Sequence, residues 1–175
     1  MDSAFDYLLT QAEVGVGFVA VSAILILFRQ VRGGELSPYQ MFVIQMFIEV
    51  DVVMIHASLL PILLHGSGIE EPWLWRAPSL ALGVLLLGYF VVYWRRRPKN
   101  AELGPTHPTV VFNIGGSYLA AGLLIANGMQ WASRGVYLLG IAWLLMLMTV
   151  MLVAFVRIFF RSDATIVARG PDGQA

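Results

Sequence analysis

The chain has 175 residues, of which 58% are hydrophobic and only 13% are charged. This composition is typical of polytopic membrane proteins and excludes an ordinary soluble domain. The 11 basic residues balance the 11 acidic ones, so a net charge of zero indicates no nucleic-acid partner. Cysteine is absent, which excludes disulfides, thiolate chemistry, cysteine-ligated clusters and covalently attached c-type haem.

Five apolar segments are each long enough to cross a hydrocarbon layer of ~30 Å at ~1.5 Å per helical residue. These predicted spans cover residues 7–28, 41–64, 77–94, 110–131 and 136–160. The sequence therefore predicts an all-α transmembrane helical bundle over residues 1–163. We expect the polar tail, residues 164–175, to be disordered.

The first, third and fourth spans differ in their surfaces. The first carries Glu13 about two turns from its start, with Gly17 and Ala20 where another helix can approach closely. The third, almost all Leu, Val and Gly, is apolar on every side, so we expect it to face lipid. The fourth is rich in Gly and Ala, which favours packing against other helices.

The basic residues predict the orientation. With the N-terminus outside and the C-terminus in the cytoplasm, nine of the 11 basic residues lie in the cytoplasm, and only Arg76 and Arg134 lie outside. If the fourth span were re-entrant, the basic residues near the C-terminus would break this rule. The cluster from Arg95 to Lys99 is most simply a topology and headgroup anchor, with a specific anionic-lipid site as the alternative.

The second span is unusual because Glu49, Asp51 and His56 lie near its middle. An Asp at the centre of a membrane helix costs about 2.5–3.5 kcal/mol on insertion scales, and we assume a similar cost for Glu. The favourable insertion free energy of the apolar residues of this span does little more than offset the cost of the two acids. We therefore expect this helix to lie among other helices.

Helical periodicity places the polar residues of the second span on two faces. At ~100° per residue, Gln45, Glu49 and His56 share one face, and Asp51 and Ser58 share the opposite face. Each face needs a neighbouring helix, a second copy of the chain or water. Five helices enclose such a span poorly in a monomer, so we expect a homo-oligomer.

Ionisable groups inside a membrane indicate function by default. In the functional interpretation, Glu49 and Asp51 hold a cation or proton along a hydrated path and His56 relays protons near neutral pH. Pro61 removes a backbone hydrogen bond and frees the carbonyl of Ala57, which predicts a kink or hinge. In the structural interpretation, each acid is protonated or hydrogen-bonded and only fixes helix contacts.

Depth in the predicted bundle suggests polar partners. Glu13 and His56 lie at similar distances from the outer boundary and could pair, with Asn127 slightly shallower.

Tyr118 and Thr149 lie at a depth similar to that of Glu49 in the second span. Asp51 lies nearest the midplane of the membrane and has no evident partner in this chain, which suggests that it contacts water, an ion or the same residue of a second copy.

Catalytic and cofactor motifs are not visible. The sequence has no HExxH motif, serine elbow or glycine-rich phosphate loop, so we expect no enzyme. Haem ligation within a bundle usually needs two His at matched depth on facing helices, whereas His56 and His65 share one span and His107 lies at the other side. No cofactor is predicted, although a homodimer could present a haem pair. A metal site is disfavoured because Asp51 points away from Glu49 and His56.

Three short patterns suggest a relationship. They are Glu13 with Gly17 and Phe18, Trp75 with Arg76, and Phe155-Val156-Arg157. Together they resemble a set of small bacterial polytopic membrane proteins without an assigned function. The resemblance implies a location in the bacterial inner membrane and implies no activity.

These observations predict a small oligomeric cation or proton channel or transporter that uses the acidic and His groups of the second span. The main alternative is a non-conducting accessory or scaffold subunit of a larger membrane complex. A haem-binding redox subunit and an intramembrane enzyme are less favoured. The expected partners are the lipid bilayer, further copies of the chain and a partner membrane subunit.

Overall fold

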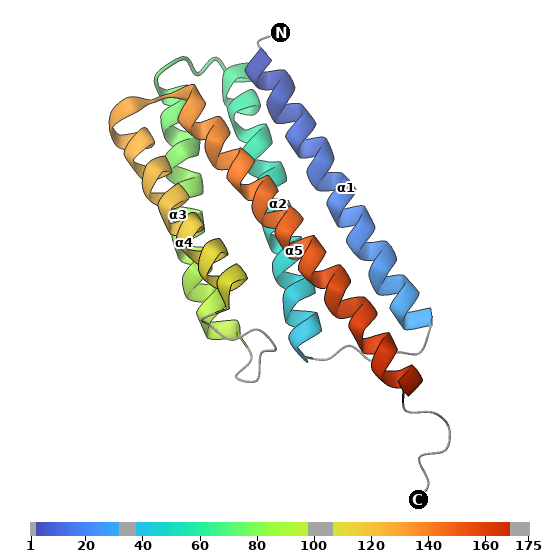
Figure 1. Cartoon of the computed structure of the whole chain (residues 1–175). Coiled ribbons are helices and arrows are strands. Elements are labelled where there is room, and N and C mark those ends of the chain that lie inside the picture. Colours follow the sequence, from blue (N-terminus) through green and yellow to red (C-terminus); the bar gives the residue numbers. More distant parts are fainter. Residues whose placement is uncertain (1–2, 32–37, 98–106, 169–175) are drawn as a thin grey trace, which may run out of the picture.

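The computed structural model describes residues 3–31, 38–97 and 107–168, and all regular structure in this part of the chain is helical (Figure 1). The long helices are α1 (Ser3–Val31), α2 (Pro38–Gly66), α3 (Trp73–Arg96), α4 (Pro108–Ala126) and α5 (Arg134–Ala168). A π-helical turn, η1 (Asn127–Trp131), extends α4. The prediction of five helices long and apolar enough to cross a membrane is confirmed.

The described helices begin or end a few residues beyond the predicted bounds, and the largest differences are in α3 and α5. Helix α3 begins at Trp73 rather than at residue 77, because Leu74 and Trp75 are buried and extend the packed face. Helix α5 continues past residue 163 to Ala168, and the rest of the predicted tail lies outside the described residues. Helix α4 and η1 together form a segment of 24 residues, as a spanning helix requires.

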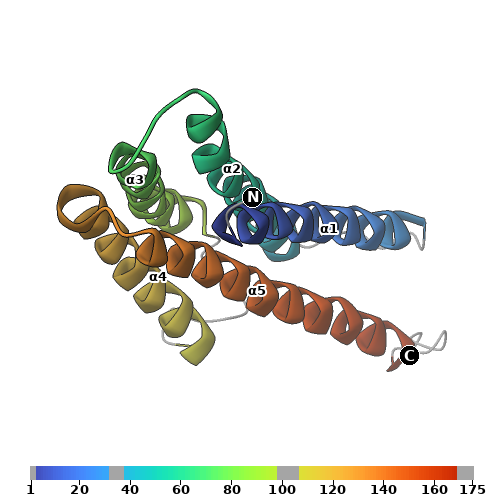
Figure 2. The same cartoon turned by 90° about the horizontal axis from the view of Figure 1, so that it is seen from above.

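Helix α2 lies in the middle of the bundle and contacts α1, α3 and α5. Helices α3 and α4 pack together on one side, and α1 runs along α2 and α5 on the other (Figures 1 and 2). The central helix expected from the sequence is therefore surrounded by three neighbours within one chain.

The expectation that the third span only faces lipid is wrong for one of its faces. Leu82, Leu86 and Phe90 of α3 are buried. A Cβ atom on Gly83 would lie 2.7 Å from Ile125 Cγ1 of α4, so only glycine allows the two helices to approach this closely. A uniformly apolar span gives no sequence signal to separate a protein-facing side from a lipid-facing one.

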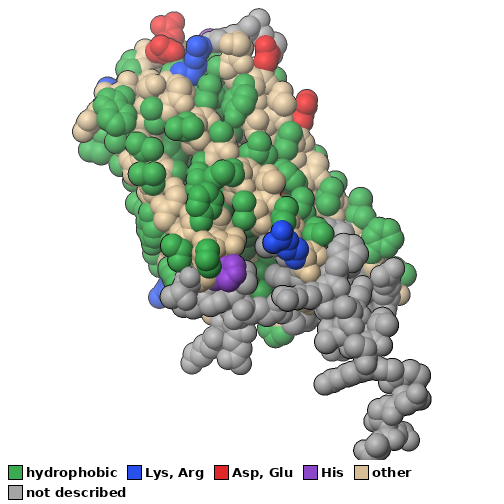
Figure 3. All heavy atoms as spheres, viewed as in Figure 1, with side chains coloured by type: hydrophobic (Ala, Val, Ile, Leu, Met, Phe, Trp, Pro, Cys, Tyr) green, Lys and Arg blue, Asp and Glu red, His purple; other side chains and the backbone are tan. Residues whose placement is uncertain are grey.

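The core joins all five helices. Its largest fully buried apolar side chains are Leu8, Met46, Met54, Trp75, Leu82, Leu124, Tyr137, Ile141, Leu144 and Met148. Outside this core, hydrophobic side chains cover much of the surface, and on the face shown in Figure 3 the acidic side chains gather at the end where α1 begins. Such an apolar exterior is what a lipid environment requires.

Candidate functional site

The two acids of α2 lie in different environments, as helical periodicity predicts for residues two apart. Asp51 is fully buried, with 0% of its surface exposed. The Glu49 side chain is 34% exposed and forms an ion pair with Arg96. The two carboxylates therefore do not form one binding site.

Asp51 has no hydrogen-bond partner for either carboxylate oxygen within the described residues. Ser58 Oγ on α2 and Gln11 Oε1 on α1 are also buried without partners there. We call Gln11, Asp51 and Ser58 the core polar group. Burying an uncharged polar atom without a partner costs about 1–3 kcal/mol, and burying a bare charge costs far more.

Helix contacts place the core polar group at one interface. Helices α1 and α2 are antiparallel, since the ring of Phe5 lies 5.0 Å from that of His65 and the ring of Phe18 lies 6.1 Å from that of Phe47. Between these pairs, a Cβ on Gly15 would lie 2.8 Å from a side-chain atom of Ile55.

The same register fixes the levels of the three residues. Gln11, one turn before Gly15, lies at about the level of Ser58, and Asp51 lies about two turns nearer the N-terminus of α2. The core polar group thus follows the α1–α2 interface over part of its length.

Glu49 lies at the junction of α2 and α3. Its Oε1 accepts from Arg96 Nη1 at 2.6 Å and from Gln45 Nε2 at 3.1 Å. Arg96 stands at the end of α3, and its side chain is 48% exposed. The sequence indicated either a topology and headgroup anchor or a specific anionic-lipid site for these basic residues, and gave no sign that one reaches back to Glu49.

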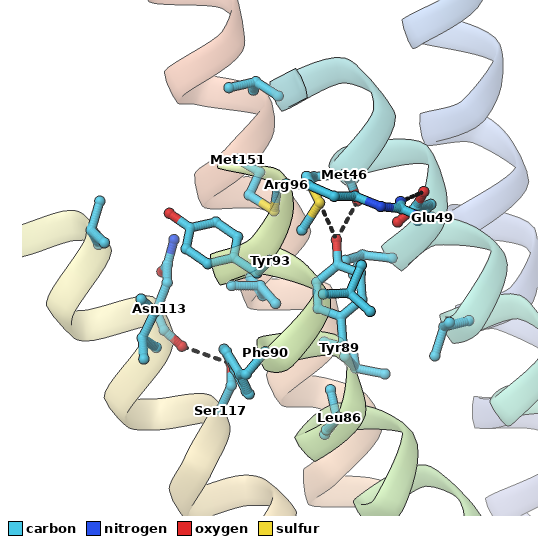
Figure 4. A pocket seen from close by; sticks show the side chains of 18 of the residues that line it. Met46, Glu49, Leu86, Tyr89, Phe90, Tyr93, Arg96, Asn113, Ser117 and Met151 are labelled. Carbon is cyan, nitrogen blue, oxygen red and sulfur yellow. Dashed lines mark hydrogen bonds and ion pairs between the residues drawn. The ribbon is translucent and has the colours of Figure 1, made fainter. Parts of the chain in front are cut away.

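A cavity of about 590 Å³ lies between α2, α3, α4 and α5 (Figure 4). Its wall is mostly Val, Leu, Ile, Met and aromatic side chains, and Glu49 and Arg96 line one end. Deeper polar groups are bonded to protein: the Tyr89 hydroxyl donates to Met46 O at 3.0 Å, and Ser117 Oγ accepts from Trp143 Nε1 at 3.0 Å.

His56 lies outside the core. It is exposed, and its Nδ1 donates to the carbonyl of Val52 at 2.8 Å, which leaves Nε2 pointing outward. Glu13 is exposed on α1 and lies ~200° around the helix from Gly15, which contacts α2. The structure therefore does not bring Glu13 and His56 together.

Pro61 is buried within α2, which stays helical to Gly66. The Ala57 carbonyl, which Pro61 cannot bond, accepts from the Tyr137 hydroxyl of α5 at 2.5 Å. Sequence reasoning identified the freed carbonyl but not its partner, because nothing local to α2 indicates which helix supplies a donor. The proline is thus held against α5.

The remaining predicted partners have local contacts. Asn127 is buried, and its Nδ2 donates to Ser79 Oγ at 2.9 Å and to Ser133 O at 3.0 Å, so it ties η1 to α3 and to the turn before α5. Tyr118 is exposed and stacks on Phe90 at 4.5 Å. Thr149 is also exposed and bonds within its own helix, to Leu145 O. These three residues do not surround the acids of α2.

Among the described residues, no three His, Asp or Glu side chains come together as metal ligands would. The candidate functional site therefore consists of two separate parts. One is the core polar group between α1 and α2, and the other is the apolar cavity with its ion pair. Comparison with family models, curated proteins and solved structures finds no match to this chain.

Proposed function

We propose that this chain is a small membrane transport protein for protons or cations and that Asp51 is the group that binds them. The observation that carries the proposal is the fully buried carboxyl without a hydrogen-bond partner in the described part of the chain. A bare carboxylate in a low-dielectric core is unstable, whereas one that holds a proton or a cation is not. Reversible loading and release of that partner is the elementary step of transport.

The core polar group supports this role. Gln11 Oε1 and Ser58 Oγ add two uncommitted oxygens to the same interface, and oxygen ligands suit protons, water and hard cations. The described chain encloses Asp51 completely, so access requires movement of a neighbouring helix. Helix α1 is the best candidate, because it lies at one side of the bundle and, among the described residues, makes most of its contacts with α2 alone.

The proposal includes an arrangement in the membrane. The N-terminus lies outside, the arginines at the end of α3 face the cytoplasm, and the membrane is the bacterial inner membrane. The distribution of basic residues supports this orientation, since nine of 11 then lie on the cytoplasmic side. Further copies of the chain cover the polar side chains that are exposed on the surface of the helical bundle.

Reconstitution tests the proposal. Purified protein in liposomes loaded with a pH-sensitive dye should dissipate an imposed proton or cation gradient, and Asp51→Asn should abolish this. Glu13→Gln is the matched control, because Glu13 is an exposed acid on a neighbouring helix. An unchanged gradient with wild-type protein, or equal dissipation by Asp51→Asn, would refute the proposal.

One observation favours a second function, that of a non-conducting accessory or scaffold subunit. Glu13 and His56 are exposed on the sides of spanning helices, where contact with lipid would be costly. A partner membrane subunit would cover them. In that case the native protein copurifies with another polypeptide, Glu13→Gln and His56→Ala weaken that association, and liposomes keep their gradient.

A further inference from the structure

We infer that the cavity between α2, α3, α4 and α5 binds an acyl chain of an anionic phospholipid, with the headgroup at Arg95, Arg96 and Arg97. The cavity volume of about 590 Å³ falls in the range of ~300–1,000 Å³ that is typical of small-molecule sites. This site is separate from the core polar group, because the cavity wall does not include Gln11, Asp51 or Ser58.

The dimensions of the cavity fit one leaflet of a bilayer. Its wall on α3 runs from Val84 to Arg96, which corresponds to about 18 Å of helix at ~1.5 Å per residue. Half of a hydrocarbon core of ~30 Å is ~15 Å. A chain that enters beside Arg96 would therefore reach the end of the cavity near the middle of the membrane.

The wall suits an alkyl chain rather than a hydrated ion. Val84 and Leu85 line the cavity and are 61% and 55% exposed, so the cavity opens sideways onto the surface that lipid covers. Tyr89 and Ser117 already bond to protein groups, so an apolar ligand would leave neither hydroxyl without a partner. Figure 4 shows Tyr89 and Phe90 lying along the wall below Arg96.

The charged end of the cavity favours an anion. Arg96 lines the cavity, stands between two further arginines in the chain, and bonds Glu49 through Nη1. A guanidinium has five N–H donors and matches a phosphate group well. Arg97 lies over the rings of Tyr93 and Trp94 at 5.6 and 5.5 Å, which holds its charge at this end.

Asn113 adds an acceptor near the same end. Its Oδ1 is buried without a hydrogen-bond partner in the described chain, and the residue lines the cavity. It lies five residues into α4, about 7.5 Å along the axis from Pro108. A hydroxyl of a phosphatidylglycerol headgroup would supply the donor that this oxygen lacks.

Gly88 offers a direct way to close the cavity. It lines the cavity, and a Cβ there would meet open space, so Gly88→Leu fills the site without a backbone clash. Gly122 on α4 also has open space around its Cβ but is not part of the wall, so Gly122→Leu is the matched control. Thermal unfolding of each variant checks that it folds.

The test is native mass spectrometry of protein released from micelles that contain equal amounts of phosphatidylglycerol and phosphatidylcholine. We expect wild-type protein and Gly122→Leu to retain one phosphatidylglycerol, and Gly88→Leu to retain about tenfold less, equivalent to ~1.4 kcal/mol. Replacing Arg96 and Arg97 by Gln should remove the preference for the anionic lipid. Equal retention by Gly88→Leu, or equal binding of both lipids by wild-type protein, would overturn the inference.

Discussion

The contact between Tyr137 and α2 gives a sharp stability prediction. Pro61 leaves the Ala57 carbonyl without its usual helical donor, and the buried Tyr137 hydroxyl donates to that carbonyl at 2.5 Å. Tyr137→Phe keeps the ring, which packs on Trp75 at 5.9 Å, and removes only the hydroxyl. A buried acceptor left without a partner costs about 1–3 kcal/mol, so the free energy of unfolding should fall by that amount.

A double-mutant cycle separates this bond from other effects of the substitution. Pro61→Ala restores a backbone N–H that can bond the Ala57 carbonyl, so in that background Tyr137→Phe should cost less. We expect a coupling of about 1 kcal/mol, within the range of ~0.5–3 that residues in contact show. Reversible denaturant unfolding in mixed micelles measures all four proteins.

Tyr118→Phe provides the control for the cycle. Tyr118 is exposed and stacked on Phe90, and its substitution should change stability by less than ~0.5 kcal/mol. An equal cost of Tyr137→Phe with and without Pro61 would refute the reasoning, because the hydroxyl would then not replace the bond that the proline removes.

Three further substitutions test other parts of the structure by the same unfolding measurement. Asp51→Leu, which keeps the branched shape of the side chain, should raise the free energy of unfolding by about 1–3 kcal/mol; a loss instead would reveal a partner for the carboxyl. Gly15→Leu should lower the free energy of unfolding by about 1–3 kcal/mol, because the new side chain would collide with α2. Gly17→Leu should change it little, because there is open space around a Cβ at that position. Asn127→Ala removes bonds to Ser79 and to the turn before α5, and should cost about 1–3 kcal/mol; no change would show that the amide does not hold that turn.

Part of the candidate site could be predicted from α2 alone. Helical periodicity separates Asp51 and Ser58 from Gln45 and Glu49, and the structure places the first pair in the core and bonds the second pair together. The loss of the Ala57 hydrogen bond also follows from the sequence. These features depend on residues within a few turns of one another, so local geometry determines them.

Contacts between helices could not be predicted in the same way. Depth alone suggested that Glu13 could pair with His56, but depth does not fix the direction in which a side chain points around its helix. The Glu49–Arg96 ion pair and the Tyr137–Ala57 bond join residues 47 and 80 positions apart. Each depends on the rotation and offset of whole helices, which many weak contacts determine together.

The sequence by itself determined that five helices are long and apolar enough to span a membrane and that α2 carries polar groups on two faces, because segment length and a repeat of about 3.6 residues are properties of the chain alone. Only the tertiary structure decided which face became the core. It enclosed Asp51 between helices without a partner in the described part of the chain and gave Glu49 an arginine, since close contact at Gly15 and Gly83 sets how the helices meet. The two acids differ because the burial of a side chain depends on how the whole bundle assembles and not on any single helix.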